Sequence, residues 1–412
     1  MATTVLIMID GLAADDLNDR PHDLPTLTAL GERGMHVTRL QSDLPATSLP
    51  GRTGIVTGVP PSTHGIFGNS ILDGEAFRYA NPDDVRVPTL AQRAKEAGLD
   101  VASVGYGMVR PEDTTTFVPP WWVGEMIMRG RDAAPVKADR GWTRLLEGRP
   151  DARLAALRDA GVEVDMPDAY QGGKLGYLTA GTEGDRRAMR SAAALAASDT
   201  PPDLILTEVL MPDVVQHVAG CGTPAAIGSL GTADAWVAVF LAELERAGRL
   251  DDVNVMVVSD HGHGPVERAL HPERILPGVT HASEGGTLFL YLPTGGLDEA
   301  TERLAAHDVR PLDGDVIPAD RPHVHAFAAP PGTAFEPAAD DAPSQVTWGQ
   351  PRYVSSHGFR AGSPRDDRAC VLAGPDIPAG KQAGAPASAV EATLAALLGL
   401  PAGGHGPSLI SD

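Results

Sequence analysis

Two apolar runs that end in acidic residues constrain the fold of this chain more than any other feature. Residues 5–9 are followed by Asp10, and residues 253–258 are followed, after one serine, by Asp260 and His261. Apolar runs that do not alternate with polar residues are typical of strands buried on both faces, as in a parallel sheet. Functional groups in such sheets gather where the strands end. We therefore expect these three polar side chains to lie at one edge of a parallel sheet.

The rest of the chain alternates between strand-like and helix-like stretches. Three further apolar runs are expected to be buried parallel strands, at residues 101–104, 204–207 and 288–292. Good helix formers at helical spacing occupy residues 25–33, 187–197, 224–246 and 387–398. This alternation predicts an α/β fold in which a mostly parallel central sheet is sandwiched between helices.

A single catalytic domain is expected over residues 1–412, although this length would also suit two or three domains. Two segments fit the alternation less well than the rest. The segment at about 107–180 is rich in proline, arginine and aromatic residues, and the segment at about 265–350 carries many prolines and several strand-like pieces. We expect both segments to be insertions that cap the central sheet.

The formal net charge of −21 makes a nucleic acid polymer or an anionic membrane surface an unfavourable partner. A small anionic substrate is still compatible with this charge, because bound cations can reverse the local sign inside a site. Cys221 and Cys370 are too few for a disulfide framework or a cysteine metal site. The apolar runs fall short of a membrane span of about 20 residues, and the N-terminus reads as a strand rather than a signal peptide. We therefore expect a cytoplasmic protein; its oligomeric state is not indicated by the sequence.

A second group of metal-binding side chains follows the apolar run at residues 204–207. Asp213 and His217 are four residues apart, a spacing that places both side chains on one face of a helix. His357 lies in a Ser-Ser-His-Gly stretch nearer the C-terminus. Together with the residues at the two strand ends, this gives three carboxylates and three imidazoles. Such a set is suited to two divalent metal ions.

Ser48 is the candidate nucleophile. Pro50 is suited to the first turn of a helix, which would place Ser48 at or near the helix N-terminus. Free backbone N–H groups and the helix dipole stabilise a developing anion there. A serine hydroxyl needs a base or a metal to become a good nucleophile, and no Ser-His-Asp motif is evident, so metal activation is the simpler interpretation. The neighbouring Thr47 remains an alternative nucleophile.

The motifs around these residues occur in one order along the chain. They are IMIDG at 7–11, SLP at 48–50, IVTG at 55–58, HGI at 64–66, Asn69, PD at 212–213 with His217, SDHG at 259–262 and HG at 357–358. In this order they resemble the nucleotide pyrophosphatase/phosphodiesterase and phosphonoacetate hydrolase branch of the alkaline phosphatase superfamily. The resemblance covers residues 5 to about 360. It implies an alkaline phosphatase-like fold and a hydrolase of a small anionic, phosphorus-containing substrate.

The resemblance also implies a role for each motif residue. Asp213, His217 and His357 would hold one zinc ion, and Asp10, Asp260, His261 and the Ser48 oxygen would hold the other. Manganese uses similar ligand sets, so Mn²⁺ is the alternative cofactor to two Zn²⁺. Asn69 would bind a non-bridging phosphoryl oxygen. Ser48 would attack phosphorus in line, and water would then hydrolyse a phosphoseryl intermediate.

Three other functions remain open at this stage. The first is cleavage of a phosphonate P–C bond, because residues 56–69 look closest to phosphonoacetate hydrolases. The second is sulfate ester hydrolysis, because the run from Ser48 to Arg52 also resembles the sulfatase pattern of Cys or Ser, any residue, Pro, any residue, Arg. The third is a catalytically silent binding protein, which would be expected to lose metal ligands, whereas all six are present here. We favour a phosphodiesterase or nucleotide pyrophosphatase.

Three residues are candidates for binding the rest of the substrate. Phosphonoacetate hydrolases use lysines for the substrate carboxylate just after the strand that corresponds to residues 101–104. This chain has no lysine there but has Arg110, which could bind a carboxylate instead. Trp121 and Trp122 could stack on a nucleobase or another flat leaving group, as a phosphodiesterase would require.

Overall fold

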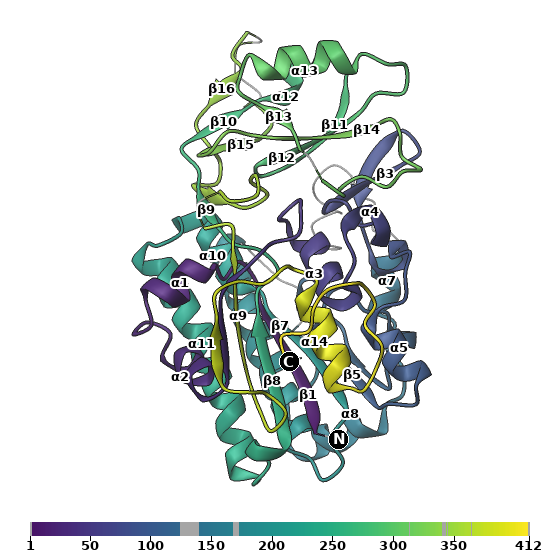
Figure 1. Ribbon diagram of the computed structural model, residues 1–412, viewed down its shortest axis with the longest axis vertical. Coiled ribbons are helices and arrows are strands. Elements are labelled where there is room, and N and C mark those ends of the chain that lie inside the picture. Colours follow the sequence, from purple (N-terminus) through teal and green to yellow (C-terminus); the bar gives the residue numbers. More distant parts are fainter. Residues whose placement is uncertain are drawn as a thin grey trace.

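The computed structural model describes residues 2–123, 140–167, 173–312, 314–339, 343, 345–363 and 365–410. Within these residues an eight-stranded sheet forms the centre of the fold (Figure 1). Only β18 among its strands runs against the others. The strand order is β19 (Gly380–Gln382), β2 (Met35–Leu40), β18 (Arg368–Ala373), β8 (Val253–Val258), β1 (Thr3–Ile9), β7 (Leu204–Val209), β5 (Val101–Val104) and β6 (Thr116–Val118). The prediction of a mostly parallel sheet is confirmed.

The three central strands finish together at one edge of the sheet. β1 pairs in parallel with β8, with Met8 beside Val258, and with β7, with Ile9 beside Val209. Each strand is buried along its whole length, as its uninterrupted apolar run predicts. The residues that follow the three strands therefore emerge side by side at this edge.

Helices cover both faces of the sheet. Alternate side chains of β1 point to opposite faces, so Leu6 and Met8 enter one core and Val5, Ile7 and Ile9 enter the other. The first core is completed by α3 (Ser48–Thr57), α5 (Leu90–Glu96), α7 (Arg140–Leu145) and α14 (Ala389–Leu397), and α4 (Pro61–His64) packs against α3. The second is completed by α1 (Ala14–Asp19), α2 (Pro25–Arg33), α8 (Ala152–Asp159), α9 (Gly173–Ala196) and α11 (Pro224–Arg246).

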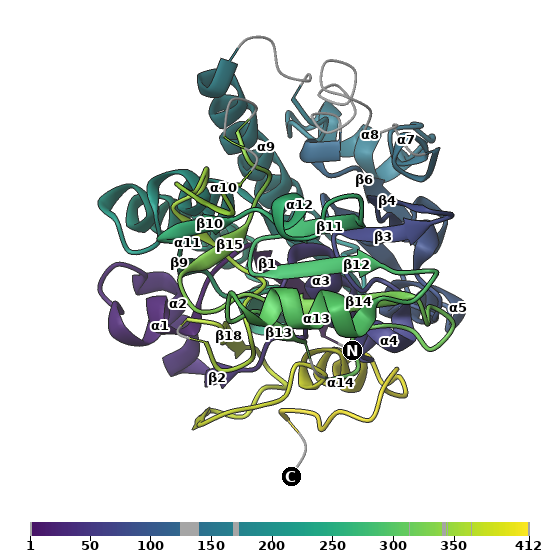
Figure 2. The same ribbon diagram turned by 90° about the horizontal axis from the view of Figure 1, so that it is seen from above.

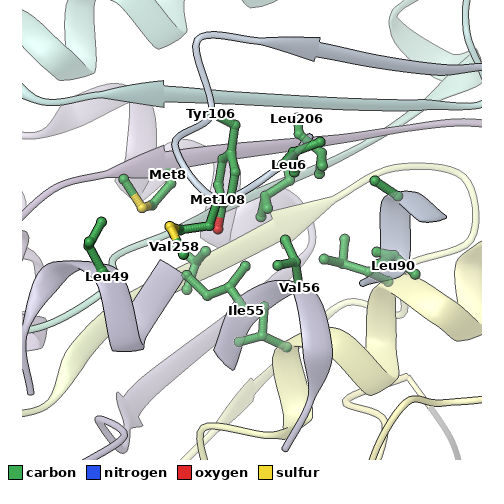
Figure 3. Packing of buried hydrophobic residues seen from close by; sticks show 14 of the residues in the cluster. Leu6, Met8, Leu49, Ile55, Val56, Leu90, Tyr106, Met108, Leu206 and Val258 are labelled. Atoms are coloured by element: carbon green, nitrogen blue, oxygen red, sulfur yellow. The ribbon is translucent and has the colours of Figure 1, made fainter. Parts of the chain in front are cut away.

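Helix α3 is fixed to the sheet by its apolar side chains. Leu49, Ile55 and Val56 of α3 pack with Leu6 and Met8 of β1 in the first core (Figure 3). All three α3 side chains are at most 1% exposed. This packing gives the beginning of α3 a defined position relative to the end of β1.

Small sheets stand at the end of the central sheet where β1 finishes (Figure 1). Seen from above, β11, β12 and β14 lie over β1 and α3 (Figure 2). One unit has the order β11 (Thr280–Glu284), β12 (Thr287–Tyr291), β14 (Val324–Ala328) and β13 (Arg310–Pro311); another has β15 (Thr333–Phe335), β10 (Arg268–Leu270) and β16 (Trp348–Gly349). Helices α12 (Pro272–Ile275) and α13 (Leu297–Ala305) belong to the same region, and β17 (Ser355–Ser356) pairs with β9 (Gly264–Pro265) at its base.

The expectation that residues 288–292 form a parallel core strand is wrong. They fall in β12, which is antiparallel to both β11 and β14. Its side chains Leu288 and Leu290 are buried in a separate small core with Phe327 and Phe335. A short apolar run therefore identified a buried strand correctly but not the sheet to which the strand belongs.

Part of the segment at 107–180 belongs to the central sheet and not to an insertion that caps it. Its β6 is an edge strand of the central sheet, because β6 pairs in parallel with β5. The segment also contains a short 3-10 turn (Pro111–Asp113), α7, α8 and the beginning of α9. Residues 124–139 and 168–172 lie outside the described part of the chain. A hairpin of β3 (Ser70–Asp73) and β4 (Ala76–Tyr79) precedes this region.

Helix α11 is the one described helix that is long and apolar enough to cross a membrane. It packs against α2, α9 and α10 (Met211–Ala219). Leu230, Val237, Phe240 and Leu244 on one of its faces are buried in the second core. In this fold α11 therefore serves as a covering helix of the central sheet.

Candidate active site

The first cluster consists of Asp10, Asp260 and His261, which follow β1 and β8. Their ligand atoms lie within 4.8 Å of one another. His261 Nε2 is 3.3 Å from Asp10 Oδ1 and 3.7 Å from Asp260 Oδ2. All three side chains are at most 1% exposed. The parallel pairing of β1 with β8 explains this convergence, because residues after paired strands emerge as neighbours.

The second cluster consists of Asp213, His217 and His357, whose ligand atoms also lie within 4.8 Å of one another. Asp213 and His217 project from one face of α10, where His217 Nε2 is 3.4 Å from Asp213 Oδ2. His357 follows β17 and places its Nε2 3.9 Å from Asp213 Oδ1. The two clusters adjoin, since the ring centroids of His261 and His357 are 4.0 Å apart. Residues from four separate parts of the chain thus meet at one place.

The hydrogen bonds of the histidines favour a cation in each cluster. His261 Nδ1 lies 2.8 Å from the carbonyl oxygen of Gly262, and His217 Nδ1 lies 2.9 Å from that of Ser355. A carbonyl can only accept, so each Nδ1 carries a proton, and in the neutral ring Nε2 is then the nitrogen that offers a lone pair on the side of the carboxylate. Asp10 Oδ1 and Asp213 Oδ1 are both buried with no hydrogen-bond partner among the described residues. Acceptor atoms facing one another without protons are the arrangement that a metal ion completes.

Electrostatic repulsion within the first cluster also favours a bound cation. Burial, reinforced by the neighbouring Asp260 carboxylate, raises the pKa of Asp10 well above its ordinary value. Two carboxylates buried side by side repel each other unless cations offset their charge. The buried Arg52 guanidinium contacts both carboxylates but also Glu208, so a net negative charge remains. The donor set therefore fits a divalent metal both by geometry and by charge.

Ser48 lies beside the first cluster, at the beginning of α3. Its Oγ is 3.2 Å from His261 Nε2, and its side chain is half-buried. Thr47, which precedes the helix in an extended conformation, is fully buried. Ser48 is thus the first helical residue, close to the N-cap position predicted for it.

Asn69 lies against the beginning of the same helix. Its Oδ1 accepts a hydrogen bond of 2.8 Å from the backbone N–H of Leu49. The backbone N–H groups of Asn69 and Ser70 both donate to the Glu284 carboxylate, at 2.7 and 2.6 Å. Because Oδ1 is used as the acceptor, the Nδ2 amide is the end of the side chain that remains to donate. Glu284 belongs to β11, so the small antiparallel unit fixes the position of Asn69.

A family model for type I phosphodiesterases/nucleotide pyrophosphatases matches residues 4–341 of the chain. The chain belongs to this family. The type I phosphodiesterase/nucleotide pyrophosphatase family comprises hydrolases of phosphoric esters, and the predicted relationship to this branch of the alkaline phosphatase superfamily is confirmed.

Relatives in sequence and structure agree with this assignment. An uncharacterized pyrophosphatase/phosphodiesterase of Schizosaccharomyces pombe is 24% identical over 268 residues, which cover 64% of this chain and 45% of that protein. The chain thus spans about half the length of this curated relative. Murine ectonucleotide pyrophosphatase/phosphodiesterase 5 has the same fold, with a TM-score of 0.70 and 16% identity over 100% of this chain and 98% of that one. The human protein gives a TM-score of 0.70 at 16% identity, over 99% and 97% of the two chains.

In this member of the phosphodiesterase family, Trp121 and Trp122 are buried, which does not support the hypothesis that they stack on the substrate. They are 6% and 8% exposed, and both belong to the first core. The indole N–H of Trp121 donates to Asp185 at 2.9 Å, and that of Trp122 donates to Glu208 at 2.5 Å. Buried rings whose N–H groups are bound to buried carboxylates are structural, and they offer no open face to a leaving group.

Replacing Trp121 with phenylalanine should reduce stability and leave substrate binding unchanged. The substitution removes one buried hydrogen bond to Asp185, which also accepts from the backbone N–H groups of Leu210 and Met211 at the beginning of α10. We expect a loss of about 1–2 kcal/mol in the free energy of unfolding, measured by urea denaturation. A tenfold higher KM for a nucleotide ester with unchanged stability would instead restore the stacking hypothesis.

Arg110 is likewise engaged away from the two clusters. Its guanidinium donates to Asp113 at 2.8 Å and to the Gln92 side chain at 3.2 Å. Within the described part of the chain, Arg110 makes no hydrogen bond or ion pair with Ser48 or with either cluster. The proposal that Arg110 binds a substrate carboxylate therefore finds no geometric support.

Several residues of the site were not recognised from the sequence as part of it. Glu284 has no motif around it, and its buried position raises its pKa to about 7. His263 comes directly after the SDHG motif and is 1% exposed, with its Nε2 3.4 Å from Asp213 Oδ1. Arg52 was considered only as part of a sulfatase-like pattern, although it lies four residues after Ser48 on the same helix. That helical spacing was the one signal available.

Proposed function

We propose that the chain is a two-metal hydrolase of phosphoric diesters, with a nucleotide-type substrate and Ser48 as the nucleophile. The observation that carries the proposal is the convergence of three carboxylates and three imidazoles in two adjoining clusters beside the Ser48 hydroxyl. Family membership supports the reaction class. A murine relative with the same fold has been observed in complex with AMP, as an inactive threonine-to-alanine variant, which supports a nucleotide substrate.

The proposed metal assignment follows the two clusters. Asp10, Asp260, His261 and the Ser48 oxygen would hold one Zn²⁺, and Asp213, His217 and His357 would hold the other; Mn²⁺ is the alternative. When bound, these cations would supply positive charge that favours the ionised serine and stabilises the leaving oxygen. We also propose one catalytic domain, with the small sheets of residues 265–350 as the larger cap over it.

The proposed reaction has two displacement steps, the first by Ser48 and the second by water. Ser48 Oγ attacks phosphorus, the bond from phosphorus to the leaving oxygen breaks, and a seryl phosphodiester is formed. Water then attacks the same phosphorus, displaces Ser48 Oγ and releases the nucleoside monophosphate. The half-buried position of Ser48, against the full burial of Thr47, supports Ser48 as the attacking group.

Asn69 would stabilise the negative charge that develops on phosphorus. Its side-chain carbonyl is held by Leu49 and its backbone by Glu284, so the free Nδ2 amide is preorganised next to Ser48. The beginning of α3 adds the partial positive charge of a helix N-terminus. These donors act at a fixed distance and need no reorganisation as charge develops.

Replacing Asn69 with alanine should lower kcat for a nucleotide ester by about 10²–10³-fold, the usual effect of removing one oxyanion donor. KM should change little, because the interaction is strongest in the transition state. Steady-state kinetics on the zinc-loaded protein would measure both constants. Replacement with aspartate, which keeps the acceptor for Leu49 and loses the donor, should be at least as damaging. An unchanged kcat in both variants would remove Asn69 from the mechanism.

A substrate panel tests the proposed function as a whole. The zinc-loaded protein would be given the p-nitrophenyl ester of thymidine monophosphate, bis-p-nitrophenyl phosphate, p-nitrophenyl phosphate, phosphonoacetate and p-nitrophenyl sulfate. We expect the nucleotide ester to give the highest kcat/KM. Phosphate release from phosphonoacetate alone would favour P–C cleavage, and turnover of the sulfate ester alone would contradict the phosphodiesterase proposal.

A further inference from the structure

Arg52 is a fully buried cation that contacts three carboxylates. It is 1% exposed, and its guanidinium donates to Asp10 Oδ2 at 2.5 Å, to Asp260 Oδ2 at 3.0 Å and to Glu208 Oε2 at 3.0 Å. Asp10 and Asp260 are two of the three residues in the first cluster. With all three carboxylates ionised, this group has a net charge of −2, which a divalent cation would neutralise.

Glu208 gives Arg52 a fixed anchor on the side away from the cluster. Its carboxylate also accepts from the indole N–H of Trp122 at 2.5 Å and from the backbone N–H of Gly107 at 3.2 Å. The Trp122 ring lies over the guanidinium, whose carbon is 5.9 Å from the ring centroid. Glu208 and Trp122 therefore hold the guanidinium on the side away from the cluster, and neither belongs to the metal site.

The hydrogen bonds leave a defined set of carboxylate oxygens for a metal. Arg52 occupies Asp10 Oδ2, so Asp10 Oδ1 is the oxygen that faces His261. Asp260 Oδ1 accepts from the backbone N–H groups of Gly11 and His261, at 3.3 and 3.1 Å, so Oδ2, which also accepts from Arg52, is the oxygen turned to the cluster. Each carboxylate is thus arranged to bind a metal through one oxygen rather than two.

Arg52 also connects the cluster to the nucleophile. Ser48 and Arg52 are four residues apart in α3 and therefore lie on the same face of the helix. Between them, Gly51 allows α3 to approach the end of β8 closely, because a Cβ at this position would lie 2.2 Å from the carbonyl oxygen of Asp260. One turn of helix thus carries both the proposed nucleophile and the clamp on two proposed metal ligands.

We propose that Arg52 is a positioning residue that leaves Asp10 Oδ1 as the metal-facing oxygen, orients Asp260 through its Oδ2 and ties both ligands to the helix that carries Ser48. This inference rests on the proposed function, because it concerns the metal site of that reaction. This role requires the planar guanidinium of arginine. One rigid group donates three hydrogen bonds in three directions, each to a different carboxylate.

Metal binding tests the proposal independently of catalysis. Zinc would be titrated into the chelator-treated full-length protein against a chromophoric chelator, for the wild type, Arg52→Met, Arg52→Lys and Arg93→Met. Arg93→Met is the matched control, because it removes an arginine from a pair with the buried Glu391 in a different part of the fold. We expect the wild type and Arg93→Met to bind two zinc ions with equal affinity. One of the two sites in Arg52→Met should bind about 10–100-fold more weakly, as when an outer-shell partner of a ligand is lost.

Kinetics separate positioning from general destabilisation. In saturating zinc, kcat of Arg52→Met for the thymidine monophosphate ester should fall about 10²-fold with KM within about threefold, since a misplaced nucleophile affects the chemical step. Arg52→Lys keeps the buried charge but loses the planar fork, so it should recover only part of the zinc affinity and should not recover kcat; it also serves if Arg52→Met does not fold. Wild-type zinc affinity and kcat in a folded Arg52→Met or Arg52→Lys would overturn the positioning role. Two bound zinc ions in the wild type without diester turnover would instead contradict the proposed function and leave the zinc comparison valid.

Discussion

Substitution of Ser48 by alanine should abolish turnover of a nucleotide ester, with a loss of at least about 10⁴-fold in kcat/KM. The reason is that no other described hydroxyl combines partial exposure with a position beside His261 at the beginning of α3. The fold should be unaffected, because Ser48 Oγ contributes no buried hydrogen bond to the core. The measurement is initial-rate kinetics on zinc-loaded protein, with thermal unfolding as a check of the fold.

Thr47→Val provides the matched control for the Ser48 substitution. Valine keeps the shape of the buried Thr47 side chain and removes its hydroxyl group. We expect this variant to keep kcat within about tenfold of the wild type, because its effect is confined to packing beneath the nucleophile. Activity lost in Thr47→Val and retained in Ser48→Ala would transfer the nucleophilic role to Thr47.

Substitution of Asp213 by asparagine should have the second largest effect, a loss of about 10³-fold or more in kcat with one zinc ion missing. Asp213 is the one carboxylate of the second cluster, and it contacts both His217 and His357. An amide keeps the shape but loses the charge that offsets a divalent cation. Zinc content by atomic emission should fall from two ions per chain to one, and excess zinc should restore only a small part of the activity.

Asp234→Asn is the matched control for the Asp213 substitution. Asp234 is also buried, at 3% exposure, but it accepts from the backbone N–H groups of Thr26 and Leu27 at the beginning of α2. We expect Asp234→Asn to reduce the free energy of unfolding by about 1 kcal/mol and to retain two zinc ions and wild-type kcat. Loss of zinc from both variants alike would mean that metal retention reports fold stability rather than ligation.

The parts of the site that the sequence predicts are those defined by local pattern. An apolar run that ends in an acidic residue specifies both a buried strand and the position of its last side chain, as at Asp10 and Asp260. The spacing of Asp213 and His217 likewise specifies one face of a helix, which α10 confirms. In these cases the pattern that determines where the side chain lies is contained within about ten consecutive residues.

The parts that the sequence does not predict depend on contacts between distant segments. Glu284 reaches Asn69 across 215 positions of the chain, and Arg52 reaches Glu208 across 156. β2 and β18 join the central sheet through antiparallel pairing with no local signal for their partners. The sequence offers Trp121 and Trp122 as candidates for stacking, because the carboxylates that bind their N–H groups lie more than 60 residues away.

The most direct test of the central claim is to identify the covalent intermediate. The zinc-loaded protein would be mixed with the p-nitrophenyl ester of thymidine monophosphate, quenched in acid within milliseconds, digested and analysed by mass spectrometry. The account predicts that the peptide containing Ser48 gains one thymidylyl group, attached to the Ser48 oxygen, and that chelator-treated protein gains none. Release of p-nitrophenol without this adduct, or an adduct on Thr47 or on a histidine of the site, would contradict the account.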